Sequence, residues 1–125
     1  MSRKLLVIDD EPGVTAIVEN IAPMLDLNVM AVREPSDAID AFIDFQPDLV
    51  LLDIVMPEVD GIDILHDIML SGIPTTLVLM CGFSDAYVRI AQGVASFHGA
   101  PPLQVLRKPF RRDDLAILLR EMLPG

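Results

Sequence analysis

The segment that most constrains the fold is DLVLLD, residues 48–53. Its four consecutive apolar residues show no alternation of polar and apolar positions. A continuous apolar strand is typical of a parallel sheet that is covered on both faces. Parallel strands need long crossover connections, which are usually helices. We therefore expect helical segments before and after this strand.

Strands and helices are predicted to alternate along the chain. The predicted strands cover residues 4–8, 27–33, 48–53, 75–80 and 103–106. Apolar residues recur at helical spacing over 14–25, 35–43, 61–70, 84–98 and 115–123. This order predicts an α/β fold, a doubly wound (βα)5 flavodoxin-like sandwich whose five-stranded parallel sheet has helices on both faces. We expect one domain over residues 1–125.

Composition excludes several classes of protein. The chain is 52% hydrophobic, which is too apolar for a disordered protein. Its net charge of −10 argues against direct nucleic-acid binding. The apolar runs are too short for a membrane span or a signal peptide, so we expect no membrane contact. The single cysteine, Cys81, excludes an internal disulfide framework and favours a reducing, cytoplasmic location.

Charged residues follow three of the predicted strands. In a doubly wound sheet, ligands bind beyond the carboxyl ends of the strands. Asp9 and Asp10 follow the first strand, Asp53 ends the third and Lys108 follows the fifth. We expect the carboxylates to converge, and hard carboxylate oxygens at this density suit Mg²⁺. Carboxylates, a metal and a lysine together indicate a site for a phosphoryl group.

Three motifs with these residues resemble a known family. They are VIDDEP at 7–12, LLDIVMPEVDG at 51–61 and LRKPF at 106–110. Together they make the chain similar to the bacterial two-component response-regulator receiver domain of the CheY-like type, over essentially its whole length.

The resemblance implies a role for each site residue. Asp53 would be the phosphorylated aspartate, and Lys108 would pair with the phosphoryl oxygens. Asp10 would bind Mg²⁺ directly, Asp9 would assist, and Asp53 and the backbone carbonyl of Val55 would complete the protein ligands.

The resemblance also implies local geometry and partners. Lys108-Pro109 would be a cis peptide, while Pro57 and Gly61 would shape the loop after Asp53. The donor would be a sensor histidine kinase or a phosphotransfer protein. Phosphorylation would switch contacts with an output domain or an effector protein. The domain would not be a conventional enzyme, because it would catalyse only its own phosphorylation and slow dephosphorylation.

Two positions depart from the family pattern. Cys81 stands where the family normally has a Thr or Ser hydroxyl that bonds the phosphoryl group, and a thiol is a weaker donor. Val105 stands where the family favours an aromatic residue whose rotamer follows activation. These departures put the usual hydroxyl–aromatic coupling in doubt.

Sequence features separate this function from its alternatives. A phosphatase of the haloacid dehalogenase type would need Asp-x-Asp after the first strand, where this chain has adjacent aspartates. A flavodoxin would need a Ser/Thr-rich loop in place of DDEPGVT. A degenerate receiver, acting as a phosphorylation-independent interaction module, is the serious alternative. The 84–98 region carries extra apolar residues that could form a partner or homodimer face, or a broader buried stripe.

Overall fold

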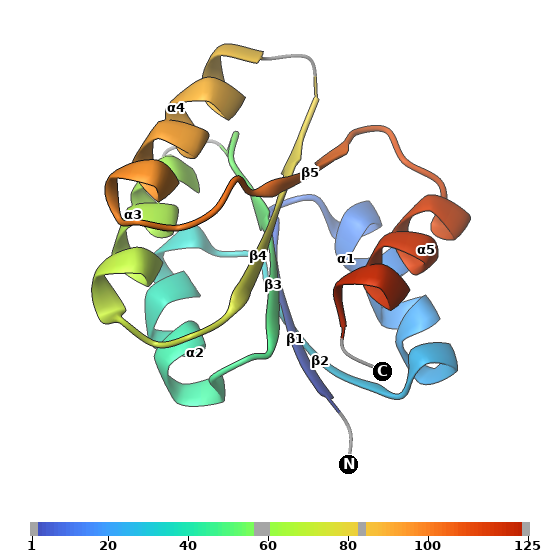
Figure 1. The fold of residues 1–125 in the computed structure, drawn as a ribbon. Helices are drawn as coiled ribbons and strands as arrows, with labels where there is room; N and C mark the ends of the chain where they lie inside the picture. Colours follow the sequence, from blue (N-terminus) through green and yellow to red (C-terminus); the bar gives the residue numbers. More distant parts are fainter. Residues whose placement is uncertain (1–2, 57–60, 83–84, 124–125) are drawn as a thin grey trace.

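A five-stranded parallel sheet forms the centre of the molecule, with strand order β2-β1-β3-β4-β5 (Figure 1). The computed structural model describes residues 3–56, 61–82 and 85–123. The strands are β1 (Arg3–Ile8), β2 (Leu27–Val32), β3 (Leu49–Asp53), β4 (Thr76–Cys81) and β5 (Gln104–Arg107). The helices are α1 (Pro12–Ile21), α2 (Ala38–Phe45), α3 (Gly61–Ser71), α4 (Asp85–Phe97) and α5 (Arg112–Met122). The predicted doubly wound sandwich is confirmed.

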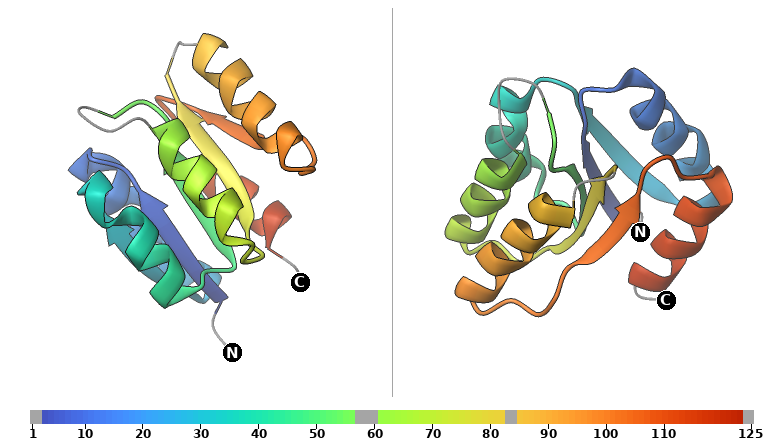
Figure 2. Two further views of the ribbon diagram at one scale, coloured as in Figure 1. Left: turned by 90° about the vertical axis from the view of Figure 1, so that its left-hand side faces the viewer. Right: turned by 90° about the horizontal axis from the view of Figure 1, so that it is seen from above.

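Helices cover both faces of the sheet (Figures 1 and 2). Helices α2, α3 and α4 pack on what we call the α3/α4 face, and helices α1 and α5 pack on the α1/α5 face. Successive residues of β3 alternate between the two, because side chains along a strand point to opposite faces. Val50 and Leu52 enter the core under the α3/α4 face, while Leu49 and Leu51 enter the core under the α1/α5 face. This double burial explains the unbroken apolar run of β3.

Element ends differ from the predicted bounds at several places. The helix expected over 14–25 ends at Ile21, and Ala22–Leu25 form a 3₁₀ helix, η1. Pro23 accounts for the change, because it has no N–H to donate and its ring crowds the carbonyl four residues earlier. A second 3₁₀ helix, η2 (Pro35–Asp37), precedes α2. Strand β4 extends to Cys81, which pairs with Arg107 of β5.

The first residue of α3 lies directly against the end of β3. A Cβ atom placed on Gly61 would overlap the backbone of Asp53 and Ile54. The family resemblance implied that Gly61 shapes the loop after Asp53, and this close approach is a physical reason for a glycine there. Pro57, the other residue assigned to this loop, lies outside the described residues.

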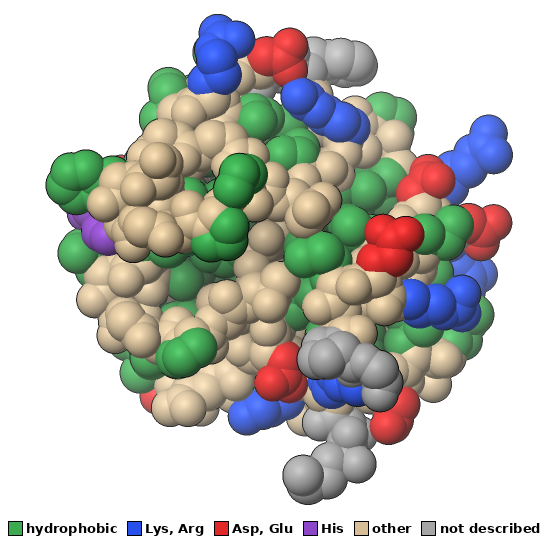
Figure 3. All heavy atoms as spheres, viewed as in Figure 1, with side chains coloured by type: hydrophobic (Ala, Val, Ile, Leu, Met, Phe, Trp, Pro, Cys, Tyr) green, Lys and Arg blue, Asp and Glu red, His purple; other side chains and the backbone are tan. Residues whose placement is uncertain are grey.

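The described surface carries charges of both signs. On the face shown in Figure 3, basic and acidic side chains are interspersed among hydrophobic ones, and the described residues form no continuous basic patch there. Within the described ranges, none of the helices combines the length and the apolar character needed to cross a bilayer.

Substituting Gly61 tests the contact between α3 and β3. We expect Gly61→Ala to lower the free energy of unfolding by about 1–3 kcal/mol, because backbone atoms must shift to admit the methyl group. The matched control is Gly93→Ala in α4, where a Cβ would meet no atom of the described residues within 4 Å. That change should raise stability by about 0.5–1 kcal/mol, the usual gain for alanine over glycine inside a helix. Urea denaturation measures both, and equal effects would contradict the contact.

Candidate functional site

Four carboxylates meet at the carboxyl ends of β1 and β3. We call Asp9, Asp10, Glu11 and Asp53 the acidic cluster; each contributes a carboxylate oxygen to a group lying within 4.8 Å. Asp9 and Asp53 are buried, Asp10 is half-buried and Glu11 is exposed. Strands β1 and β3 are neighbours in register, with Ile8 beside Leu52, so the residues that follow them meet at one edge of the sheet.

Lys108 supplies the positive charge within the acidic cluster. It follows β5, and its ammonium lies 2.7 Å from Asp9 Oδ2, 3.1 Å from Glu11 Oε1 and 3.2 Å from Asp53 Oδ2. Its side chain is 14% exposed. The Lys108-Pro109 peptide is cis, as the family resemblance implied. A single cation therefore contacts the carboxylates that end two different strands.

Backbone groups hold the two buried carboxylates in place. The N–H of Glu11 donates to Asp9 Oδ1 at 2.9 Å, and the N–H of Val55 donates to Asp53 Oδ1 at 3.0 Å. Asp9 Oδ2 is a buried oxygen with no properly angled hydrogen bond from the described residues, although it is in ionic contact with Lys108. Its coordination is therefore incomplete, which matters for cation binding.

Burial and charge act against each other at the site. Burial raises the pKa of Asp9 from its ordinary 3.8 to about 6, although Lys108 and the N–H of Glu11 oppose the shift. Burial likewise raises the pKa of Asp53, against the opposing N–H of Val55 and Lys108. Burial disfavours the charged form of Lys108, but the contacts with the carboxylates outweigh it and raise the Lys108 pKa. Lys108 thus stays protonated, while the carboxylates lack full charge compensation.

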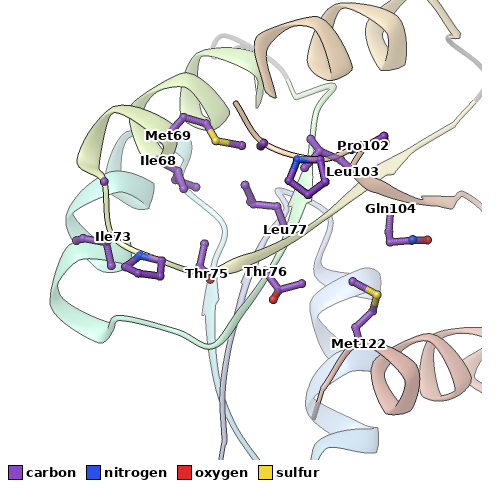
Figure 4. Close-up of a pocket in the computed structure, with 14 residues that line it drawn as sticks. Ile68, Met69, Ile73, Thr75, Thr76, Leu77, Pro102, Leu103, Gln104 and Met122 are labelled. Atoms are coloured by element: carbon purple, nitrogen blue, oxygen red, sulfur yellow. The ribbon is translucent and has the colours of Figure 1, made fainter. Parts of the chain in front are cut away.

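A hollow of about 430 Å³ opens over the site. Asp53, Val55, Lys108 and Gly82 contribute to its walls together with apolar residues of α1 and the segment before α5. A second hollow, of about 410 Å³, lies at the other end of β4 and β5. Its walls, which include Leu77, Leu103 and Met122, carry no charged side chain (Figure 4). Of these two hollows, the first is the one that adjoins the acidic cluster.

The structure brings most of the predicted site residues together. Asp9, Asp10, Asp53 and Lys108 meet as expected, and Val55 is adjacent. Cys81 is fully buried among the core residues of the α3/α4 face and does not line the hollow.

Sequence reasoning left two further residues without a role. Glu11 contacts Lys108, which its place beside Asp10 could have indicated. Arg107 contacts Cys81, and the only signal for it was its position next to Lys108.

The raised pKa of Asp9 predicts a pH dependence of stability in metal-free buffer. Between about pH 4 and pH 6 the folded chain binds more protons at Asp9 than the unfolded chain does. The contribution of Asp9 to the free energy of unfolding therefore falls as pH rises through this window. Asp9→Asn should flatten this slope, leaving the part due to Asp53. Urea denaturation at several pH values measures the free energy of unfolding and hence its slope with pH. The control is Asp67→Asn, an exposed site with the same charge change; matching slopes in both variants would refute the prediction.

Comparisons with known proteins show the family to which the chain belongs. A family model described as the response regulator receiver domain matches residues 5–120. Chemotaxis protein CheY of Listeria monocytogenes is 33% identical over 111 residues, which are 88% of this chain and 89% of that protein. Transcriptional regulatory protein TrcR of Mycobacterium tuberculosis is 30% identical over 120 residues, or 96% of this chain, which spans only 45% of TrcR.

Solved structures show the same fold. Vibrio cholerae chemotaxis protein CheY4 matches with a TM-score of 0.83 and 18% identity, over 98% of this chain and all of that one. NtrX from Brucella abortus matches with a TM-score of 0.79 and 26% identity, over 98% of this chain and 27% of NtrX. The family match covers nearly the whole described chain and includes the acidic cluster and Lys108. The chain belongs to the response regulator receiver domain family, the CheY-like modules of two-component signalling.

Proposed function

We propose that Asp53 accepts a phosphoryl group from a phosphohistidine of a sensor histidine kinase or a phosphotransfer protein. The observation that carries the proposal is the position of Lys108, whose ammonium lies 3.2 Å from Asp53 and 2.7 Å from Asp9 at the floor of an open hollow. A nucleophile, a fixed cation and space for a donor are therefore adjacent. Family membership supports the same reaction.

The transfer exchanges one bond for another. A carboxylate oxygen of Asp53 attacks phosphorus, the new P–O bond forms, and the bond from phosphorus to the donor imidazole nitrogen breaks. The bonding electrons leave with the imidazole. The N–H of Val55 orients the carboxylate through Oδ1, and Lys108 faces Oδ2. Lys108 would compensate the charge of the phosphoryl oxygens.

The donor set fits Mg²⁺. The acidic cluster offers hard oxygens, and Asp9 Oδ2 is buried with incomplete coordination. Asp10 and Asp9 would hold the ion, with Asp53 and the Val55 carbonyl as further ligands. Mg²⁺ bound there would neutralise charge shared by Asp53 and the incoming phosphoryl group.

A phosphorylation-independent interaction module is the weaker alternative. Such a module has no need to bury two carboxylates beside a lysine, because their desolvation is costly. Asp9 and Asp53 are nonetheless buried, with raised pKa values. Retaining this arrangement makes physical sense if a metal and a phosphoryl group use it.

We propose that the output is either a separate effector protein, which binds the surface of this domain, or a further domain of the same protein. TrcR, of which this chain spans 45%, is a transcriptional regulatory protein by name, so a chain of this kind can be joined to an output module. On α4, Phe97 is 86% exposed and Ile90 is 54% exposed, whereas Val88 packs against the core. The exposed pair supports the prediction of a partner or homodimer face in the 84–98 region, whose residue 84 lies outside the described residues.

Phosphorylation of Asp53 is tested by intact mass. Incubation with acetyl phosphate and Mg²⁺ should add the mass of one phosphoryl group, and chelating the Mg²⁺ should abolish the gain. Asp53→Ala should show no gain, whereas Asp67→Ala, which removes an exposed aspartate, should behave like the parent. A gain in Asp53→Ala equal to that of the parent would exclude Asp53 as the acceptor.

Removing one charged oxygen ligand tests the metal site. Asp10→Asn should weaken Mg²⁺ binding by about tenfold or more, because a hard cation loses a charged ligand. Calorimetric titration with MgCl₂ measures the affinity. Asp67→Asn carries the same change of net charge on α3 and should bind Mg²⁺ as the parent does. If both variants bind equally well, Asp10 is not a ligand.

A further inference from the structure

Two neighbouring cations at the end of β5 point to opposite faces of the sheet. Val105 packs with the core of the α3/α4 face and Leu106 with the core of the α1/α5 face. By the alternation of a strand, Arg107 belongs to the α3/α4 face. Lys108, the next residue, contacts the acidic cluster. The end of β5 therefore has one cation in the site and one cation behind it.

Arg107 joins three parts of the chain. Its Nη1 donates to Cys81 Sγ at 3.4 Å and to the Gly82 carbonyl at 3.3 Å, while its Nη2 donates to Asp85 Oδ1 at 2.6 Å. Cys81 ends β4, Gly82 follows it and Asp85 begins α4. A planar guanidinium can serve these separate partners at once, which a lysine ammonium does less well. We call this set of contacts the Arg107 bridge.

The same backbone connects the Arg107 bridge to the site. Gly82 lines the hollow beside Asp53 and Lys108. The N–H of Lys108 donates to the carbonyl of Cys81 at 2.7 Å. Asp53 follows Leu52, whose side chain enters the α3/α4 face, so the Asp53 side chain belongs to the opposite face. The Arg107 bridge thus holds Gly82 from the side of the sheet opposite to the phosphoryl site.

We propose that Arg107 is a positioning residue that opposes phosphoryl acceptance, because it holds Cys81, Gly82 and the first residue of α4 in the arrangement seen without a phosphoryl group. This inference rests on the function proposed above. Phosphoryl oxygens on Asp53 attract backbone donors on the Gly82 side of the hollow, and an inward movement there stretches the Arg107 bridge. Contacts made in only one arrangement favour that arrangement and lower the affinity for a ligand that needs another.

The Arg107 bridge also offers a connection between the site and α4. This chain needs one because Cys81 and Val105 replace the hydroxyl and the aromatic residue that provide the connection in the family pattern. Cys81 offers a thiol that accepts from Arg107 rather than a hydroxyl directed into the hollow. Val105 is packed against the core of the α3/α4 face. Arg107 links Cys81 and Asp85 directly, so a shift of Gly82 reaches α4 without a rotating aromatic ring.

If Arg107 acted only through its charge, its removal would change the affinity for an anion in the opposite direction to the one that the Arg107 bridge predicts. Arg107 is a cation beside an anion-binding site, so its removal would weaken anion binding if charge alone mattered. The Arg107 bridge predicts tighter binding when the contacts are removed. Affinity for beryllofluoride, a phosphoryl mimic, therefore separates the two explanations by direction.

The experiment is a beryllofluoride titration with excess Mg²⁺, followed by ¹⁹F and amide NMR. Arg107→Gln should bind about twofold to fivefold more tightly than the parent, the range expected for an exposed ion pair. Arg107→Lys keeps the charge but not the divided contacts, and should tighten binding less. Arg89→Gln removes an exposed cation from α4 and should not tighten it. Asp85→Asn added to Arg107→Gln should have little further effect, because both act through one contact.

The results separate a failure of the positioning role from a failure of the proposed function. Unchanged or weaker binding by Arg107→Gln and Arg107→Lys, with the parent binding the mimic, would overturn the positioning role and leave the proposed function intact. A parent that neither binds the mimic nor gains a phosphoryl group would overturn the proposed function and this inference with it. Urea midpoints confirm that each variant is folded, and Arg107→Lys provides the test if Arg107→Gln is not.

Discussion

The contact of one ammonium with three carboxylates is the interaction on which the site depends. Lys108 lies between Asp9, Glu11 and Asp53, and without it two buried carboxylates would face each other with no protein cation among the described residues in contact. The sheet makes this contact possible, because parallel strands end at the same edge and deliver residues distant in sequence to one place. The desolvation that raises the pKa of Asp9 and Asp53 is only partly offset by Lys108. The remaining imbalance of charge would favour a metal ion at this site, as proposed above.

Much of this could be predicted from the sequence, because burial and strand direction leave clear patterns. The apolar run of β3 indicated a sheet covered on both faces, and the acidic and basic residues after β1, β3 and β5 indicated a convergent site. These inferences need only the period of a strand and the rule that ligands bind at carboxyl ends. The family motifs then implied a role for each of these residues.

Other features depended on three-dimensional detail that periodicity does not carry. Pro23 lies within an apolar pattern of helical spacing, and the pattern concealed the change to a 3₁₀ helix. Cys81 was expected at the position where the family has a hydroxyl beside the phosphoryl group, whereas its side chain lies in the core of the α3/α4 face. His66 and His98 are 32 positions apart in the sequence, yet their ring nitrogens lie 3.3 Å apart between α3 and the residue that follows α4. The contacts of Arg107 join residues 22 and 26 positions away along the chain, beyond the reach of local patterns.

The close approach of Gly61 to the backbone of Asp53 and Ile54 makes the two sides of the site mechanically unequal. On the β3 side, α3 and the strand end are in backbone contact with no free space, so they must move as one body. On the β4 side, a Cβ placed on Gly82 would meet no atom of the described residues within 4 Å beyond its chain neighbours. The two walls of the hollow therefore differ: the β3 side has backbone packed against backbone, whereas the β4 side is held at Gly82 by the side chain of Arg107. We expect a group added to Asp53 to displace the Gly82 side first, because a side-chain contact yields more easily than packed backbone.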